Sequence, residues 1–230
     1  MLAQEAKQDS ISTKKISYKE LIIPSVLIGY GIIGIESDAL INLNLEIKEE
    51  VNENIDHKIT IDDFTQYVPA ASVYALNALA IKGKSNFKDR SLILATSYLL
   101  VAATTLPIKN STHVQRPDGS SFNSFPSGHT ATAFAGAEFL WQEYKDVSIW
   151  YGISGYIVAS GTGFFRMYND RHWLTDVAAG AGIGILCTKT AYWLYPKMQK
   201  LLFKKETKAA VMVAPFYNGK QTGIGIVSRF

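Results

Sequence analysis

The 230-residue chain contains a single cysteine, Cys187, so an internal disulfide is excluded. Its four histidines are scattered and no Cys/His group has the spacing of metal ligands, which argues against a zinc or iron site. A net charge of +3 is too small to indicate a nucleic-acid partner, and no zinc-finger, RNP or helix-turn-helix pattern is present. Because 47% of the residues are hydrophobic and 19% are charged, disorder is excluded as well. The length fits one domain with short appendages.

Long hydrophobic runs are also missing, since the charge-poor stretches fall short of or only approach the ~20 residues of a membrane-spanning helix. There are six such stretches, at 21–35, 68–81, 91–107, 130–140, 147–165 and 177–195. They predict an all-α domain of six main helices embedded in a membrane. A soluble helical bundle is the alternative.

The charges between these stretches favour the membrane interpretation. Basic residues gather before the first stretch, between the second and third, and after the last, whereas acidic residues crowd the connection at 36–67. The positive-inside rule places the basic segments in the cytoplasm. Six crossings then bring 36–67, 108–129 and 166–176 together on the outer side. The alternative is that the basic residues only solvate helix ends.

The two ends of the chain have a different character. We expect a polar N-terminal segment at 1–19, the helical domain at 20–200, and a basic segment with a tail at 201–230. No conventional signal peptide is visible, but the opening MLAQEA is typical of the remnant left by signal peptidase, which would put the N-terminus outside and contradict six crossings. In the tail, Asn218-Gly219 between two apolar segments predicts a β-hairpin or an extended tail.

The first outer connection carries residues suited to a phosphate. Lys109 and Arg116 are cations seven positions apart, and Pro117-Asp118-Gly119 predicts a turn. The chain then returns to Ser127-Gly128-His129 at the start of the fourth stretch. Cations beside the amides of a helix N-terminus suit an anion such as phosphate. Taken alone, a capping serine and surface charges would also explain this loop.

The second outer connection contains His172 and Asp176, four positions apart, which share a face if they lie on a helix. A carboxylate there can hold the imidazole N–H, fix its tautomer and stabilise a positive ring, as the third member of a catalytic triad does. Arg166 precedes them and can reach a shared anion. A histidine and an aspartate four positions apart are weak evidence when taken alone. This pair, however, lies on the same predicted side as the first connection.

Together these motifs resemble the signature of the type 2 phosphatidic acid phosphatase (PAP2) superfamily, which includes bacterial class A acid phosphatases and vanadium haloperoxidases. The shared pattern is Lys-x6-Arg-Pro, Pro-Ser-Gly-His and Arg-x5-His-x3-Asp. It is carried here by Lys109, Arg116-Pro117, Pro126-Ser127-Gly128-His129, Arg166, His172 and Asp176. The family usually has serine where this chain has Phe165, which puts one polar contact near the phosphate in doubt.

The resemblance implies a six-helix PAP2/haloperoxidase-like bundle with 20–200 as its catalytic domain. It also implies that His172 attacks phosphorus and forms a phosphohistidine, that Asp176 orients His172, and that His129 protonates the leaving oxygen. The phosphoryl oxygens would be held by Lys109, Arg116, Arg166, Ser127 and the Gly128 amide. No metal or other cofactor is implied.

The implied activity is metal-independent hydrolysis of a lipid phosphate monoester or pyrophosphate. The expected place is a bacterial inner membrane, among membrane lipids, with the site facing the periplasm. Phosphatidylglycerol phosphate, undecaprenyl pyrophosphate, phosphatidic acid and lipid A phosphate all remain open as substrates. The alternatives are a soluble periplasmic acid phosphatase acting on small esters, a vanadium-dependent haloperoxidase, and a membrane scaffold with a decayed site.

Other residues receive no chemical role. Gly180, Gly182 and Gly184 have the spacing of a nucleotide loop but follow the His172 and Asp176 element rather than a strand. Close packing between helices explains these small residues better. His113 is interpreted as a solvated loop residue.

Overall fold

The protein is described by a computed structural model covering residues 17–53, 58, 60–202, 210–217 and 221–229. Its contacts divide the chain into two units, Met1–Pro196 and Lys197–Phe230. The signal-peptidase remnant suggested for residues 1–6 lies outside the described residues.

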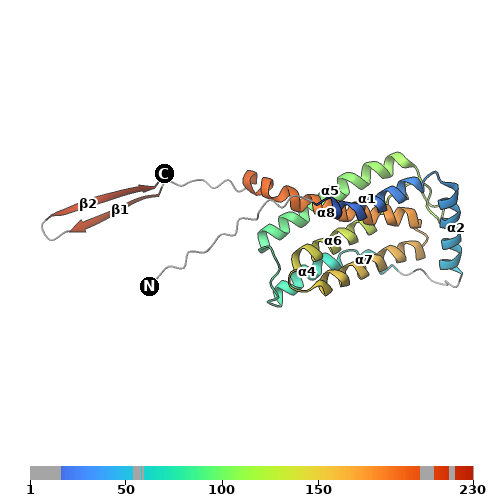
Figure 1. The fold of residues 1–230 in the computed structure, drawn as a ribbon, viewed down its shortest axis with the longest axis horizontal. Coiled ribbons are helices and arrows are strands. Elements are labelled where there is room, and N and C mark those ends of the chain that lie inside the picture. The colour runs from blue at the N-terminus through green and yellow to red at the C-terminus, as the bar shows by residue number, and fades with distance from the viewer. Residues whose placement is uncertain (1–16, 54–57, 59, 203–209, 218–220, 230) are drawn as a thin grey trace. The chain divides into compact units, whose positions relative to one another are not determined.

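Helices form the first unit (Figure 1). Each of the six predicted stretches overlaps one main helix, so the predicted all-α fold is confirmed. Two further helices lie between the first two main ones. In chain order the helices are α1 (Tyr18–Ile33), α2 (Asp38–Asn52), α3 (Asp62–Thr65), α4 (Val68–Ala78), α5 (Phe87–Thr112), α6 (Gly128–Tyr144), α7 (Ile149–Tyr168) and α8 (Leu174–Leu202).

The described part of the second unit consists of the last residues of α8 and a two-stranded antiparallel sheet of β1 (Ala210–Tyr217) and β2 (Thr222–Arg229). Its register runs from Ala210 opposite Arg229 to Tyr217 opposite Thr222. The predicted C-terminal hairpin is therefore confirmed. The Asn218-Gly219 turn that suggested it lies outside the described residues.

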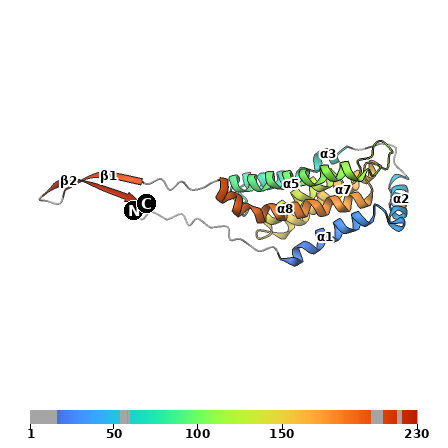
Figure 2. The same cartoon turned by 90° about the horizontal axis from the view of Figure 1, so that it is seen from above.

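Helix α6 occupies the interior of the bundle. Figure 2 shows the same ribbon from above. Ala131, Ala133, Ala135 and Ala137 project in different directions around the helix, yet all are 0% exposed. A helix buried on every side must be surrounded by its neighbours. Alanine has a small side chain, so the neighbouring helices can approach closely.

The glycines of α8 let this helix pack directly against α6. A Cβ at Gly180 would stand 2.5 Å from the Ser127 carbonyl oxygen, and one at Gly184 would stand 2.2 Å from that of Ala131. Gly182 faces α1 instead. At Gly180 and Gly184 the carbonyl oxygens of α6 are too close for any side chain. This supports helix packing as the reason for these glycines. The contact also brings the start of α6 beside the first turn of α8.

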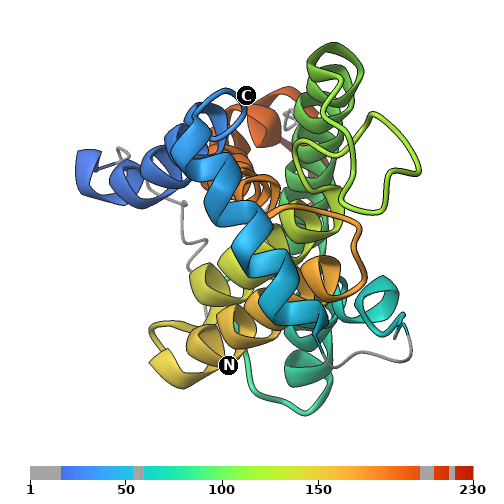
Figure 3. The same ribbon diagram turned by 90° about the vertical axis from the view of Figure 1, so that its right-hand side faces the viewer.

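Helix α2 crosses the end of the bundle where the motifs gather (Figure 3). The chain bends by 94° between α1 and α2. Asn44 of α2 donates from Nδ2 to Thr175 Oγ1 at 3.0 Å, and Lys48 Nζ donates to the Pro117 carbonyl at 2.7 Å. These bonds attach α2 to both motif-bearing connections.

Apolar length supports fewer membrane crossings than the six expected. Of the described helices, only α5 and α8 are long and apolar enough to span a membrane, or three spans if the bent pair α1 and α2 forms one. Helices α1, α4 and α6 have 16, 11 and 17 residues. In addition, α6 buries Glu138 and Glu143, and Lys189 of α8 pairs with Glu138 at 2.8 Å. The six-crossing count is therefore not supported by length and composition.

Adding a methyl group at the α6–α8 contact should destabilise the bundle. Gly184→Ala is expected to lower the free energy of unfolding by about 1–3 kcal/mol, because the new Cβ overlaps the Ala131 carbonyl. The matched control is Gly161→Ala on α7, where a Cβ meets nothing within 4 Å. Alanine forms helix better than glycine by about 1 kcal/mol, so the control should be neutral or stabilising. Thermal unfolding in detergent measures both, and equal midpoints would contradict the packing assignment.

Candidate active site

His172 and Asp176 form a buried pair at the start of α8. His172 lies just before the helix and Asp176 lies in its first turn. The His172 Nδ1 and Asp176 Oδ2 atoms are 3.5 Å apart, and the side chains are 2% and 1% exposed. When Nδ1 of the neutral ring carries the hydrogen that faces the carboxylate, Nε2 carries the free lone pair. The pairing expected from the sequence is therefore present, with the histidine preceding the helix rather than lying on it.

Ser124 is a third member of this group that sequence reasoning missed. Its hydroxyl donates to Asp176 Oδ2 at 2.5 Å and lies 3.4 Å from His172 Nδ1. The backbone N–H of Trp173 donates to the same carboxylate oxygen at 2.9 Å. Two donors thus fix the carboxylate in place beside the imidazole. A serine in a polar loop carries no spacing signal, so only the packing of the loop reveals its place.

Burial makes His172 a neutral imidazole at neutral pH. Its enclosed position lowers its pKa to about 4, against the opposing effect of Asp176. A neutral ring keeps the Nε2 lone pair available. This protonation state suits a nucleophile and excludes a standing positive charge on the ring at pH 7.

The start of α6 is held directly against this pair. The Ser127 N–H donates to the Asp176 backbone carbonyl at 3.0 Å. The Ser127 hydroxyl accepts from the Thr130 N–H at 3.4 Å and lies 2.8 Å from the Thr130 hydroxyl, so it caps α6. Ser127 therefore caps α6, and its hydroxyl is engaged within the helix start.

Lys109 and Arg116 both attach to the segment that leads into the second motif. Lys109 Nζ donates to the carbonyls of Asn123 and Ser124 at 2.8 and 3.2 Å. Arg116 Nε donates to Asn123 Oδ1 at 2.9 Å. A Cβ at Gly128 would stand 3.8 Å from Lys109 Cε, so this lysine also lies beside the start of α6. Both cations are thus placed next to the residues of the second motif.

Two aspartates of α3, which the sequence analysis did not assign to the site, contact its other members. Arg166 Nη1 pairs with Asp62 Oδ2 at 2.5 Å, and Asp62 is 1% exposed. His129 Nε2 lies 2.9 Å from Asp63 Oδ1. No motif spacing signals these contacts, because the connection at 36–67 reaches the site only by tertiary folding.

A cleft of about 350 Å³ contains three of the expected site residues, Arg116, His129 and Arg166. His172 does not line this cleft but is joined to it through Arg166, whose carbonyl accepts the His172 N–H at 3.2 Å. The remaining lining is mostly charged. It consists of Lys58, Thr60, Asp62, Asp63, Asn169 and Arg171. The concentration of cations suits an anionic ligand.

The nearest arrangement to a metal site in the described part of the chain is the group of Asp62, Asp63 and His129, whose ligand atoms lie within 4.8 Å of one another. The Arg166 guanidinium already pairs with Asp62 and stands 3.9 Å from Asp63. A metal cation here would be repelled by that fixed positive charge. We therefore interpret the aspartates as partners of Arg166 and His129, and assign no metal.

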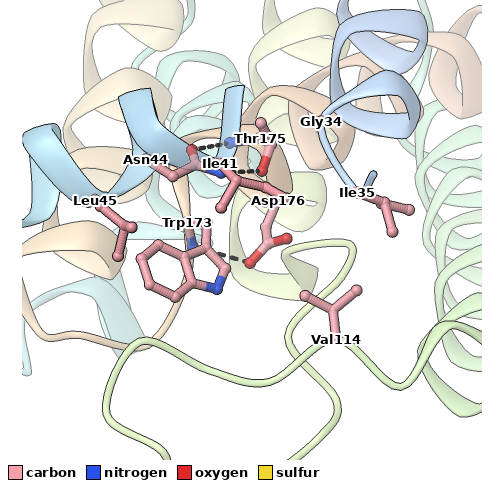
Figure 4. A pocket seen from close by; sticks show the side chains of 9 residues that line it. All are labelled: Gly34, Ile35, Ile41, Asn44, Leu45, Val114, Trp173, Thr175 and Asp176. Atoms are coloured by element: carbon pink, nitrogen blue, oxygen red, sulfur yellow. Dashed lines mark hydrogen bonds between the residues drawn. The ribbon is translucent and has the colours of Figure 1, made fainter. Parts of the chain in front are cut away.

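An apolar pocket of about 210 Å³ lies on another side of Asp176, between α2 and the bundle (Figure 4). The side chains around the carboxylate are largely hydrocarbon, which strengthens its electrostatic interaction with His172. Asp176 Oδ1 has no hydrogen-bond partner among the described residues. The pocket is lined by Gly34, Ile35, Ile41, Asn44, Leu45, Val114, Trp173, Thr175 and Asp176.

Phe165, the departure from the usual motif, belongs to an aromatic group near the end of α7. Its ring centroid lies 5.9 Å from that of Phe164 and 5.8 Å from that of Tyr168. These edge-on contacts replace the polar contact that a serine would offer before Arg166.

Known proteins resemble this chain in sequence and in fold. Residues 90–200 match the PAP2 superfamily model. A lipid A 1-phosphatase of Porphyromonas gingivalis is 40% identical over 148 residues, covering 64% of this chain and 32% of that protein. Bacitracin transport permease protein BcrC of Bacillus licheniformis is 33% identical over 76 residues, covering 33% of this chain and 36% of that protein. The chain thus spans about a third of the length of these two relatives.

Among solved structures, the fold is similar to that of a transmembrane PAP2-type phosphatidylglycerolphosphate phosphatase from Bacillus subtilis. The TM-score is 0.53 at 21% identity, over 80% of this chain and 98% of that one. Residues 90–200, which carry all three motifs, thus match the PAP2 superfamily, and the wider helical fold is similar to that of this PAP2-type structure. With its apolar helices α5 and α8, the chain is a membrane protein, and the soluble alternative is not supported.

The buried histidine should make stability depend on pH. Between about pH 6.5 and pH 4 the unfolded chain binds a proton at His172 that the folded protein does not, so stability falls as the pH drops through this window. His172→Gln removes this proton uptake, and its stability should decline less steeply than that of the wild type. Denaturant unfolding in detergent at several pH values measures the slopes. Parallel curves for both proteins would show that His172 is not the buried neutral group described here.

Proposed function

We propose that this protein hydrolyses a lipid phosphate ester or pyrophosphate, in a bacterial inner membrane with the site facing the periplasm. The observation that carries the proposal is the buried pair of His172 and Asp176 next to a cation-rich cleft, built from three motifs on separate connections. In this proposal residues 20–200 form the catalytic domain.

In the first step, the lone pair on His172 Nε2 attacks phosphorus, forming an N–P bond as the bond to the leaving oxygen breaks. The ring becomes positive, and Asp176 stabilises that charge through Nδ1. In the second step, water attacks the phosphohistidine and releases inorganic phosphate, which restores the neutral histidine. Ser124 holds the carboxylate in the required orientation.

The phosphoryl oxygens are bound by Lys109, Arg116, Arg166 and the first-turn amides of α6, including that of Gly128. Phosphoryl transfer spreads negative charge over three equatorial oxygens, so fixed cations and amides contribute most of the catalysis. Ser127 contributes by ordering this helix start, since its hydroxyl caps α6. Asp62 orients the Arg166 guanidinium.

His129 is proposed as the acid that protonates the leaving oxygen. It lines the cleft on the first turn of α6, beside the groups that would hold the phosphate. An alkoxide leaving group needs a proton, and a positioned acid contributes roughly 10²–10⁴ in rate.

A lipid phosphate is the proposed substrate class because the site belongs to a membrane protein. Lipid A phosphate is the first candidate, since the Porphyromonas gingivalis lipid A 1-phosphatase shares 40% identity over 148 residues. Phosphatidylglycerol phosphate, undecaprenyl pyrophosphate and phosphatidic acid are the other candidates. The surrounding membrane lipids would present any of these to the site.

A substrate panel tests the function. Purified wild type and His172→Ala, in detergent, would be given p-nitrophenyl phosphate and the four lipid candidates, with phosphate release measured. We expect release from at least one lipid, and a loss of at least about 10³-fold in the variant because no nucleophile remains. Release from the small ester alone would contradict a lipid phosphatase, and equal rates in both proteins would contradict His172 as nucleophile.

The acid role of His129 predicts a dependence on the leaving group. His129→Ala should slow hydrolysis of an alkyl phosphate by about 10²-fold or more, but p-nitrophenyl phosphate far less, because p-nitrophenolate leaves without a proton. The ratio of kcat/KM values for the two substrates is the measurement. Equal losses on both would show that His129 does not donate the proton.

A further inference from the structure

Asp63 stands in direct contact with the side chain that the proposed mechanism uses as its acid. Its Oδ1 atom lies 2.9 Å from His129 Nε2, and the two residues are separated by a long stretch of sequence. The hydrogen bonds of the described residues engage only Nε2 of this ring, so Nδ1 is not committed to a protein partner. The pair mirrors Asp176 and His172, with one carboxylate against each imidazole.

Neighbouring contacts hold Asp63 in place. Asp62 beside it is bound by Arg166 and by the Asn169 side-chain amide, which donates to Asp62 Oδ1 at 2.9 Å. The Thr65 and Thr162 hydroxyls are 2.9 Å apart. These contacts tie the single turn of α3 to α7, so the Asp63 carboxylate reaches His129 from a fixed backbone.

The charges around His129 explain why the contact matters. Burial and the Arg166 cation lower the pKa of His129, whereas Asp63 and then Asp62 raise it, and together these effects leave the pKa below its ordinary value. The rest of the cleft adds cations from Lys58, Arg116 and Arg171. Without Asp63, the positive field would lower the pKa of the imidazole further, and a smaller fraction of the rings would carry the proton that the acid must donate.

We propose that Asp63 is a positioning residue for His129, orienting the imidazole and favouring its protonated form for transfer to the leaving oxygen. This inference rests on the proposed phosphatase function. In the step itself, the Nδ1–H proton of the imidazolium moves to the leaving oxygen as the P–O bond breaks. The ring becomes neutral and keeps its Nε2–H on Asp63. Asp63 acts through His129 and takes no part itself in the bonds that form and break.

The variant Asp63→Asn tests this role, because it keeps the shape of the side chain and removes its charge. The expected loss of kcat/KM is about 10-fold or more on an alkyl phosphate, a part of the roughly 10²–10⁴ that a positioned acid supplies. The loss on p-nitrophenyl phosphate should be within about 3-fold, because that leaving group needs little protonation. The basic limb of the alkyl phosphate pH profile should move to lower pH, since His129 then loses its proton more readily.

Three further variants make the test specific. Glu50→Gln removes an equal charge from an exposed position on α2 and should match the wild type. Asp63→Glu retains a carboxylate and should restore part of the alkyl phosphate rate and of the basic limb. In a His129→Ala background, Asp63→Asn should change the substrate ratio no further, because its effect passes through His129.

The outcomes separate this inference from the function on which it rests. If the wild type hydrolyses none of the substrates, both fail. If His129→Ala shows the leaving-group dependence and Asp63→Asn does not, only the role of Asp63 is overturned. Equal losses on both substrates in Asp63→Asn, with the basic limb of the pH profile unmoved, would identify a merely structural contact. Equal losses on both substrates with no recovery of activity in Asp63→Glu would lead to the same conclusion. A gain of activity in Asp63→Asn would also overturn the proposal.

Discussion

The close approach of α8 to the start of α6 is the contact on which the site depends. Across it, the Ser127 N–H donates to the Asp176 carbonyl at 3.0 Å. The approach is possible because Gly180 has no side chain where a Cβ would stand 2.5 Å from the Ser127 carbonyl. This backbone hydrogen bond thus joins the second motif, at the start of α6, to the third motif, which ends in the first turn of α8. The orientation of His172 and that of the α6 amides are then set together rather than by two independent loops.

Electrostatic balance is the second feature of the site. Cations from several connections converge on the cleft, and such a concentration of one sign would deprotonate any histidine placed among them. The structure places one carboxylate against each of two histidines, with different surroundings. Asp176 is buried with a neutral His172, whereas Asp63 is half-exposed at the cleft beside His129. The difference in surroundings matches the two proposed tasks, attack on phosphorus and donation of a proton.

The sequence predicted those parts of the molecule that depend on local spacing. Six charge-poor stretches predicted six main helices, and the spacing of His172 and Asp176 predicted their pairing. Ser124, Asp62 and Asp63 were missed because each reaches the site through a loop whose path is decided by tertiary packing. Length and composition support only two or three of the six predicted crossings, and α6 is a short helix that buries Glu138 and Glu143 inside the bundle. Residues buried among other helices need not be apolar when hydrogen bonds satisfy them, so charge-poor length alone did not identify a span.

The most direct test of the account is to trap the covalent intermediate. Purified protein in detergent would be mixed with a radiolabelled phosphate ester, quenched within milliseconds under alkaline conditions, and mapped by peptide analysis. The account predicts label on the peptide that contains His172, stable to base and lost in acid, as expected of a phosphohistidine. The label should be absent from His172→Ala. Hydrolysis with no trapped label, or label on another residue, would contradict His172 as the nucleophile.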